Sequence, residues 1–345
     1  MKTDLSLIEL ATQIHGRAQR KADYIVTSRQ MAADLVPTGD GDDAGLKVVL
    51  RLPDNGLPAF DINDHCHGQI AAHLDIPVKY YNRMLREQPE LLTSNINTWL
   101  GERGSERRMV RTLDGTGRAF LSDKYSRLDD DAFAETVLPV IQSVPGSQVV
   151  SASITPTKTH IKFVSNDLVR EVKAGDLIRF GIAFSNSEVG AGAIQAAMFT
   201  ERLICTNGMI SSEDVFRSAH VGAGHGSGQI ADILKIRDYA RDLLTPDRID
   251  RHITQLKELA GIPVHKPVEA VEKLAKAHSL TEGEKNSVLE HLIKGADLSM
   301  FGMAQAITRS AEDAADYDRA TDLERLGGKM LTLGRAEYRE LSMAA

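Results

Sequence analysis

Residues 179–209 read RFGIAFSNSEVGAGAIQAAMFTERLICTNGM, and this stretch decides the fold class. Its apolar segments read as two strands joined by a polar turn that contains glycine. A polar cluster closes each segment, SNSE at 185–188 and CTNG at 205–208. Functional side chains concentrate in loops at strand ends. If the two turns converge, they would line a pocket formed by Asn186, Ser187, Glu188, Cys205, Thr206 and Asn207.

Strand-like runs also precede this stretch, and helical patterns follow it. Residues 148–155 and 159–165 have alternating or continuous apolar character, while 109–113 and 118–122 flank a DGTG turn that predicts a hairpin. Beyond a glycine-rich joint at 222–228, the pattern is helical. The predicted fold class is therefore α+β: a central antiparallel or mixed sheet flanked by helices, with an all-helical C-terminal region.

The same pattern divides the chain into three regions. We expect 1–105 to be mainly helical, 106–221 to form the central α+β sheet region, and 222–345 to be helical. In the first region, apolar residues recur at helical spacing over 3–22, and a helix–turn–helix pair is expected over 69–85. Boundaries of this kind are the least precise part of a sequence-based prediction.

Bulk composition is ordinary for a globular chain. The protein has 345 residues with a net charge of -7, so nucleic-acid binding would need a local basic patch. Two cysteines in a chain of this length are no disulfide framework, which makes a reducing cytoplasm the expected compartment. No apolar run approaches the ~18 residues of a membrane span, so we expect no membrane partner.

The candidate metal and cofactor motifs are weak. His65, Cys66 and His67 could join Cys205 around zinc, but histidines two residues apart on a helix point to different faces. The glycine-rich joint could cradle a phosphate, yet it lacks the Lys-Ser/Thr ending of a phosphate-binding loop. The sequence therefore predicts no metal and no cofactor.

A basic run surrounds the predicted hairpin at 109–122. Arginines and a lysine there could track a phosphate backbone while two aromatic rings stack on bases. The alternative is an ordinary solvated charged surface, and an acidic run at 129–131 follows at once. The predicted nucleic-acid-binding residues are Arg107, Arg108, Arg111, Arg118, Phe120, Lys124 and Tyr125.

The helix pair at 69–85 raises a second nucleic-acid hypothesis. Its second helix offers Lys79, Tyr80, Tyr81, Asn82, Arg83 and Arg86. Such residues would suit readout of DNA by a recognition helix, but helical hairpins are also common packing units.

Several strings resemble a phage- and plasmid-borne family, domain of unknown function 932. They are LDIP at 74–77, FLSDKY at 120–125, SNSEVG at 185–190 and LICTNGM at 203–209. The resemblance covers most of 60–330, and the order and spacing of NSEVG and CTNGM carry it. It implies a protein encoded by a mobile element, and it implies no catalytic residue, because the family has no assigned activity.

Three functions follow as expectations. The first is a non-enzymatic nucleic-acid-binding protein, acting on single strands in replication or recombination. The second is an enzyme whose pocket is built by the NSE and CTNG turns. The third is an assembly or host-interaction protein, including a homo-oligomer, that uses the amphipathic C-terminal helices.

Overall fold

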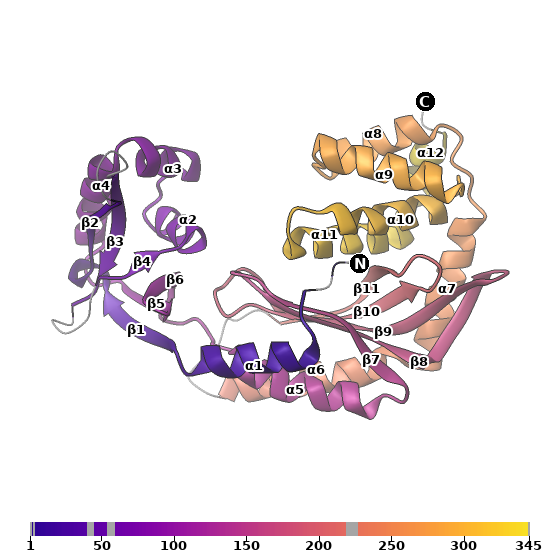
Figure 1. Cartoon of the computed structure of the whole chain (residues 1–345), viewed down its shortest axis with the longest axis horizontal. Helices are drawn as coiled ribbons and strands as arrows, with labels where there is room; N and C mark the ends of the chain where they lie inside the picture. Colours follow the sequence, from indigo (N-terminus) through magenta and orange to yellow (C-terminus); the bar gives the residue numbers. More distant parts are fainter. Residues whose placement is uncertain (1, 3, 40–44, 54–58, 219–226, 344–345) are drawn as a thin grey trace.

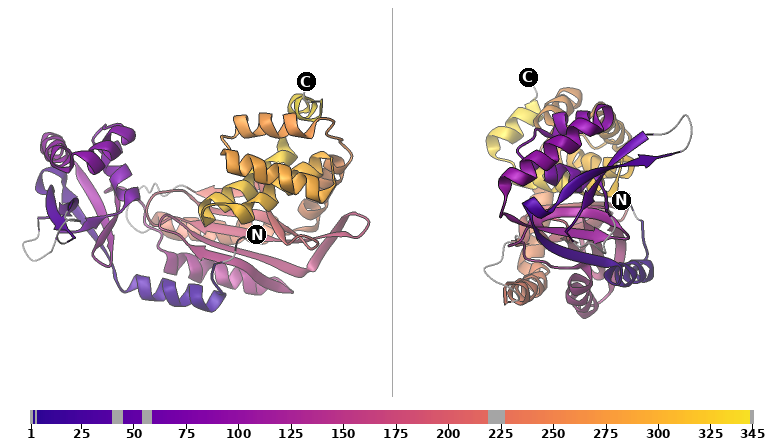
Figure 2. Two further views of the ribbon diagram at one scale, coloured as in Figure 1. Left: turned by 45° about the horizontal axis from the view of Figure 1, so that its top comes forward. Right: turned by 90° about the vertical axis from the view of Figure 1, so that its left-hand side faces the viewer.

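The computed structural model describes residues 2, 4–39, 45–53, 59–218 and 227–343. It has two lobes, a smaller one formed by β1–β6 with α2–α4 and a larger one formed by the remaining elements (Figure 1). The left view in Figure 2 shows the same separation. The expected α+β class, with its helical C-terminal region, is confirmed. None of the described helices combines the length and the apolar character needed to cross a membrane.

A five-stranded antiparallel sheet is the centre of the larger lobe, in the order β11-β10-β9-β8-β7. Its strands are β7 (Ser147–Ile154), β8 (Thr159–Lys173), β9 (Asp176–Asn186), β10 (Ile194–Arg202) and β11 (Asn207–Ser218). Along β9, Phe180, Ile182 and Phe184 enter the main apolar core, whereas Ala183 faces the opposite side with Phe199. This alternation is what a sheet covered on both faces requires.

Helices cover both faces of this sheet (Figure 1). One layer contains α1 (Leu7–Ala18), α5 (Asp130–Ser143) and α6 (Ser227–Leu243). The opposite layer contains α10 (Met300–Arg309) and α11 (Tyr317–Lys329). α7 (Pro246–Ala260) packs against β8 and α10, and its His252 contacts the Phe180 ring. Outside them lie α8 (Pro267–Ala277), α9 (Glu282–Gly295) and α12 (Arg335–Met343). Short 3-10 turns occupy Ser310–Asp313 and Met330–Thr332 in this lobe and Ser28–Gln30 in the smaller one.

The smaller lobe is inserted between α1 and α5. Its mixed sheet has the order β1-β5-β6-β4, with only β4 and β6 parallel. The strands are β1 (Lys21–Thr27), β4 (Asp61–Ile62), β5 (Arg107–Leu113) and β6 (Thr116–Ser122), beside the hairpin of β2 (Ala32–Thr38) and β3 (Gly45–Arg51). Three helices pack on them, α2 (Asp64–His73), α3 (Val78–Glu87) and α4 (Pro89–Arg103).

This insertion changes the expected division of the chain. The predicted hairpin and helices form as expected, but the boundary near residue 105 separates β1 and β4 from the β5–β6 strands of the same sheet. The region 1–105 contains more helix than strand, but it is not a separate unit. At the second boundary, most of the glycine-rich joint at 222–228 lies outside the described residues, as do 219–221.

Candidate functional site

The two polar turns of residues 185–188 and 205–208 lie at opposite ends of the larger sheet. Ser185 pairs with Gln195 at one end of the β9–β10 hairpin, and Ile178 pairs with Arg202 at the other. Gln195 and Arg202 are seven positions apart along β10, a distance of roughly 24 Å at about 3.4 Å per residue. A pocket shared by Asn186, Ser187, Glu188, Cys205, Thr206 and Asn207 is therefore wrong, because the turns do not converge.

The turn at 186–190, which follows β9, instead meets the hairpin of the smaller lobe. The Arg118 guanidinium pairs with the Glu188 carboxylate, and Arg111 Nη1 donates to the Glu188 carbonyl oxygen at 2.7 Å. Tyr125 donates its hydroxyl to the Ser187 carbonyl oxygen at 2.8 Å. Two features that the sequence places in separate sites thus form one contact, which joins the lobes. We name it the junction.

The buried arginines of the hairpin form ion pairs with carboxylates. Arg111 is fully buried, and its guanidinium contacts Asp23 at 2.8 Å and Asp129 at 2.6 Å. Burial alone would lower the pKa of Arg111, but these two carboxylates outweigh burial and raise it. Arg118 is 5 % exposed and Phe120 is 4 % exposed. These three side chains cannot line an exposed groove for a nucleic-acid backbone.

The other predicted binding residues are divided. Tyr125 is half-buried in the junction, and Arg108 is half-buried beside Glu106 at 3.4 Å and 6.0 Å from the Phe120 ring centre. Arg107 and Lys124 are exposed. The expectation of a continuous basic hairpin groove is therefore corrected, because only these last two cations lie fully at the surface.

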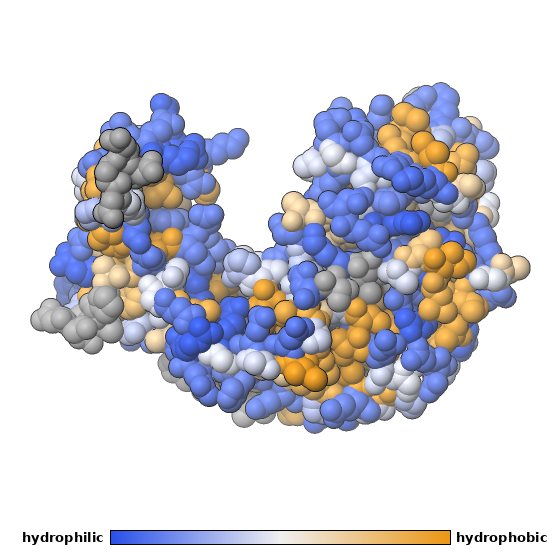
Figure 3. Space-filling view, viewed as in Figure 1, coloured by the Kyte–Doolittle hydropathy of each residue, from blue (hydrophilic) through white to orange (hydrophobic). Residues whose placement is uncertain are grey.

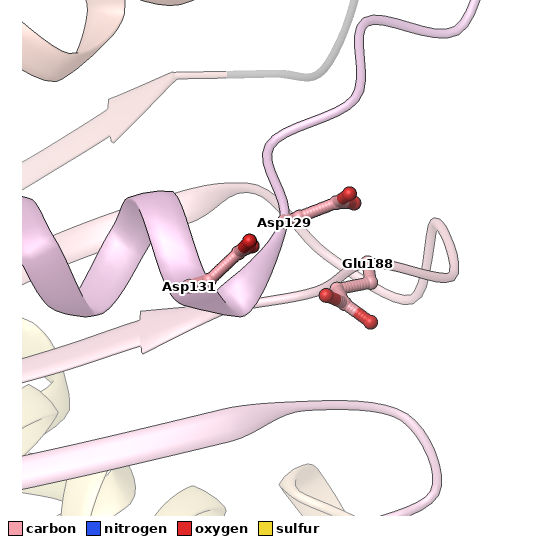
Figure 4. A group of neighbouring side chains, drawn as sticks. All are labelled: Asp129, Asp131 and Glu188. Atoms are coloured by element: carbon pink, nitrogen blue, oxygen red, sulfur yellow. The ribbon is translucent and has the colours of Figure 1, made fainter. Parts of the chain in front are cut away.

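Three carboxylates at the junction form a group that could hold a cation, those of Asp129, Asp131 and Glu188 (Figure 4). Asp129 and Asp131 lie at the start of α5, and Glu188 comes from the turn after β9. Lys21 places its Nζ 2.8 Å from Asp129 and 3.3 Å from each of the other two. The ammonium group therefore takes the position that a metal ion would need.

Asp130 lies beside this group and is ionised with difficulty. Its carboxylate accepts hydrogen bonds from Thr159 Oγ1 at 2.7 Å and Asn186 Nδ2 at 3.0 Å. Burial and the charge of Glu188 nevertheless raise the pKa of Asp130 from 3.8 to about 6. Burial raises the pKa of Glu188, but Arg118, the Asp130 backbone N–H and Lys21 together outweigh burial and lower it. The neighbouring carboxyls are thus driven apart in pKa.

This arrangement predicts a pH-dependent difference between the wild type and Asp130→Asn. A raised folded-state pKa stabilises the protein below the unfolded value, and this stabilisation is lost as pH rises through about 6. The asparagine variant does not ionise. Its free energy of unfolding relative to wild type should therefore rise by roughly 1–3 kcal/mol between pH 4.5 and 7.5. Urea denaturation at both pH values measures this, with Asp131→Asn as the more exposed control, and parallel profiles would contradict it.

The CTNG turn has a structural role of its own. Asn207 is buried and donates from Nδ2 to Gln305 Oε1 at 2.8 Å and to Thr308 Oγ1 at 2.5 Å, both on α10. Thr206 is exposed and has a φ of 51°, the left-handed conformation of a tight corner. The turn thus begins β11 and anchors α10 to the sheet.

The predicted helix–turn–helix pair is a packing unit of the smaller lobe. Tyr81 is fully buried, and its hydroxyl shares a 2.9 Å hydrogen bond with His67 Nδ1. Met84 is buried in the same core. The remaining side chains named for this helix are exposed, namely Lys79, Tyr80, Asn82, Arg83 and Arg86.

A basic pocket that the sequence reasoning missed lies between β11, α11 and the α8–α9 connection. It has a volume of about 320 Å³ and contains four cationic side chains, Arg217, Arg319, Arg325 and Lys329. We call this the basic pocket. Arg217 lies opposite Gln195 in the sheet, and Arg325 contacts Gln195 at 3.2 Å. The pocket is therefore near the sheet end that carries the junction.

The charges of the basic pocket are only partly compensated. Arg319 is held by Glu284 at 2.6 and 2.8 Å, and Arg325 lies 3.3 Å from Asp322. Over the described ranges, neither Arg217 nor Lys329 forms an ion pair. Burial lowers the pKa of Arg325, and the positive charge of Arg217 lowers it further. Such crowding of like charges favours an anionic ligand.

Little in the sequence could have revealed this pocket. Arg325 and Lys329 share one helical face by their spacing, but Arg217 is more than a hundred residues away.

Comparison with protein-family models, with curated proteins and with solved structures finds no match to this chain, so the resemblance to the phage and plasmid family stays a prediction.

Proposed function

We propose that the protein binds nucleic acid, and that the sugar–phosphate backbone enters the space between the lobes and contacts the basic pocket. The observation that supports this proposal is that pocket, where Arg217 and Lys329 form no ion pair among the described residues although the chain has a net charge of -7. Arg217, Arg325 and Lys329 would contact phosphates. A role in replication or recombination of a phage or plasmid rests on the family resemblance alone.

The shape of the molecule supports an extended ligand. The space-filling view shows a deep hollow between the lobes, with mostly hydrophilic walls (Figure 3). α2 and α3 border this hollow on the smaller lobe, and α11, which carries Arg325 and Lys329, borders it on the larger lobe (Figure 1). The junction forms the connection between the two sides.

The smaller lobe offers further exposed groups on α3, one of the helices that border the hollow (Figure 1). α3 exposes Lys79 and Arg86, together with Tyr80, whose side chain is 51 % exposed. Cations that follow a backbone and an accessible aromatic ring are the usual components of a single-strand site. A single strand could therefore contact both lobes at once, whereas a small phosphorylated molecule would use the basic pocket alone.

The test is a salt-dependent binding measurement with Arg217→Ala/Lys329→Ala. Fluorescence anisotropy with a labelled single-stranded oligonucleotide should show affinity weakened about 10- to 30-fold at 100 mM salt, since two phosphate contacts are lost. The slope of log affinity against log salt should fall in magnitude by roughly 1.4 for a single strand. Duplex DNA and RNA are measured in parallel.

Two control variants give the experiment its specificity. Arg241→Ala/Lys257→Ala removes the same charge from exposed positions on α6 and α7, and should leave affinity within about twofold of wild type. Arg107→Ala/Lys124→Ala tests the two exposed hairpin cations directly. Absence of binding by the wild type, or equal losses in the basic-pocket variant and the α6/α7 control, would remove the proposal.

A further inference from the structure

A second, smaller cavity lies at the other end of the larger sheet, beside the CTNG turn. It has a volume of about 30 Å³ and is lined in part by Arg202, Cys205, Asn207, His291, Gln305 and Arg309. These side chains come from the β10–β11 turn, α9 and α10. The cavity is separate from the junction and from the basic pocket, so nothing about it depends on nucleic-acid binding.

Two guanidinium groups face the Cys205 sulfur in this cavity. Arg202 Nη1 lies 3.9 Å from Sγ, and Arg309 Nη1 lies 3.8 Å from it. Arg202 is held in place by two 2.7 Å contacts with Asp176. Cys205 itself is partly exposed. Arg202 is neutralised by its pair with Asp176, whereas Arg309 forms no ion pair among the described residues. A partly exposed cysteine beside an uncompensated cation is the environment in which thiols react as nucleophiles.

The cavity also contains polar atoms that have no protein partner. Asn207 is 2 % exposed, and its Oδ1 accepts no hydrogen bond among the described residues. Arg309 Nε is likewise buried and has no hydrogen-bond acceptor among the residues that the structure describes. Buried polar atoms are normally satisfied, so an unpaired acceptor and an unpaired donor on two residues that line one cavity favour a small polar ligand there.

The size and polarity of the cavity select the ligand. A water-sized oxygen needs about 10–15 Å³ by the same measure, so the cavity has room for about two oxygen atoms. Hydrogen peroxide has two linked oxygens, and its O–H can donate to Asn207 Oδ1 while an oxygen accepts from Arg309 Nε. We infer that Cys205 is a peroxide-reactive thiol, with Arg309 and Asn207 holding the peroxide against its sulfur.

The reaction is a two-electron oxidation of sulfur. The Cys205 thiolate attacks one peroxide oxygen, an S–O bond forms, and the O–O bond breaks with its electron pair leaving on the second oxygen. The hydroxide that departs is stabilised by the guanidinium groups and takes up the proton that the thiol released. The products are Cys205 sulfenic acid and water, and peroxide is the only oxidant required.

Cys66 provides an internal control within the same chain. It is fully buried beneath the smaller lobe's sheet, and burial raises the pKa of its thiol to about 12. Burial accounts for this raised pKa, and no nearby positive charge within the described ranges offsets it. In the folded protein, Cys66 should therefore stay unmodified while Cys205 reacts.

The test exposes the full chain to hydrogen peroxide with dimedone, which traps sulfenic acid, and follows both cysteine peptides by mass spectrometry. Cys205 should be trapped at least about tenfold faster than glutathione under the same conditions, with no adduct on Cys66. Arg309→Gln should slow trapping at least about fivefold, whereas the exposed control Arg241→Gln should not. Protein unfolded in urea should react at the glutathione rate.

Each outcome bears on the inference. Trapping of Cys205 no faster than glutathione in the folded wild type would overturn it, as would an unchanged rate in folded Arg309→Gln. If Arg309→Gln fails to fold, the comparison of folded wild type, unfolded wild type and glutathione still decides the question.

Discussion

Replacement of Lys162 by methionine should lower the free energy of unfolding by about 3–5 kcal/mol. Lys162 on β8 is 1 % exposed, and Glu324 on α11 is fully buried. Their Nζ and Oε2 atoms are 2.5 Å apart. Methionine fills a similar volume but leaves the Glu324 carboxylate in the core without a counter-charge, and a buried unpaired charge is among the most costly defects in a folded protein.

A second substitution separates charge from packing. In Lys162→Met/Glu324→Leu the uncompensated carboxylate is gone, so most of the lost stability should return. Lys294→Met breaks a pair with Glu290 in which both side chains are 61 % exposed, and it should cost less than about 1 kcal/mol. Urea unfolding at pH 7 measures all three variants. A cost below 1 kcal/mol for Lys162→Met would show that the buried pair does not hold α11 to the sheet.

Gly328→Ala should be nearly as damaging, at about 3 kcal/mol, although alanine is otherwise the better helix former. A Cβ atom at Gly328 on α11 would lie 1.8 Å from the Ile210 carbonyl oxygen of β11. Both groups are backbone, so neither can turn aside as a side chain would. The helix would have to move away from the sheet, and the apolar contacts between them would open.

This substitution also has a functional consequence. α11 carries Arg325 and Lys329, so its displacement should distort the basic pocket and weaken oligonucleotide binding even at temperatures where the variant is folded. The matched control is Gly101→Ala in α4, where a Cβ meets no atom within 4 Å. That variant should keep or gain stability, by up to about 1 kcal/mol, because only helix propensity changes. Equal thermal unfolding temperatures for the two variants would contradict the close-approach argument.

Strong local patterns predicted elements well. The T-x-x-E spacing of Thr281 and Glu284 is a local helix-start pattern, and the two residues form a capping box at the start of α9. The expected hairpin also forms, with the DGTG turn joining β5 to β6. The alanine-rich run at 193–204, which would also suit a helix, becomes β10 because it pairs on both sides within the sheet. Strands β1, β2 and β11 escaped prediction, since their burial is mixed along the strand and gives no clean alternation.

The candidate sites show where local reasoning stops. The arginines of the hairpin read as a surface patch because their counter-charges are remote in sequence, Asp23 for Arg111 and Glu188 for Arg118. The same remoteness concealed the basic pocket, whose cations come from β11 and α11. Burial decides whether a cationic residue can bind an anionic ligand, because a cation paired with a carboxylate in the core is already neutralised.

By itself, the amino-acid sequence determined the α+β class, most of the helices, the central hairpins and the importance of the two polar turns. These properties depend on apolar periodicity, caps and turn residues, which act over a few neighbouring positions. Only the tertiary structure decided that the NSE turn joins two lobes, that the CTNG turn anchors α10, and that the uncompensated positive charge lies beside α11. The reason is physical: the electrostatic and steric environment of a side chain is set by its neighbours in space, and here those neighbours lie tens to hundreds of residues apart along the chain.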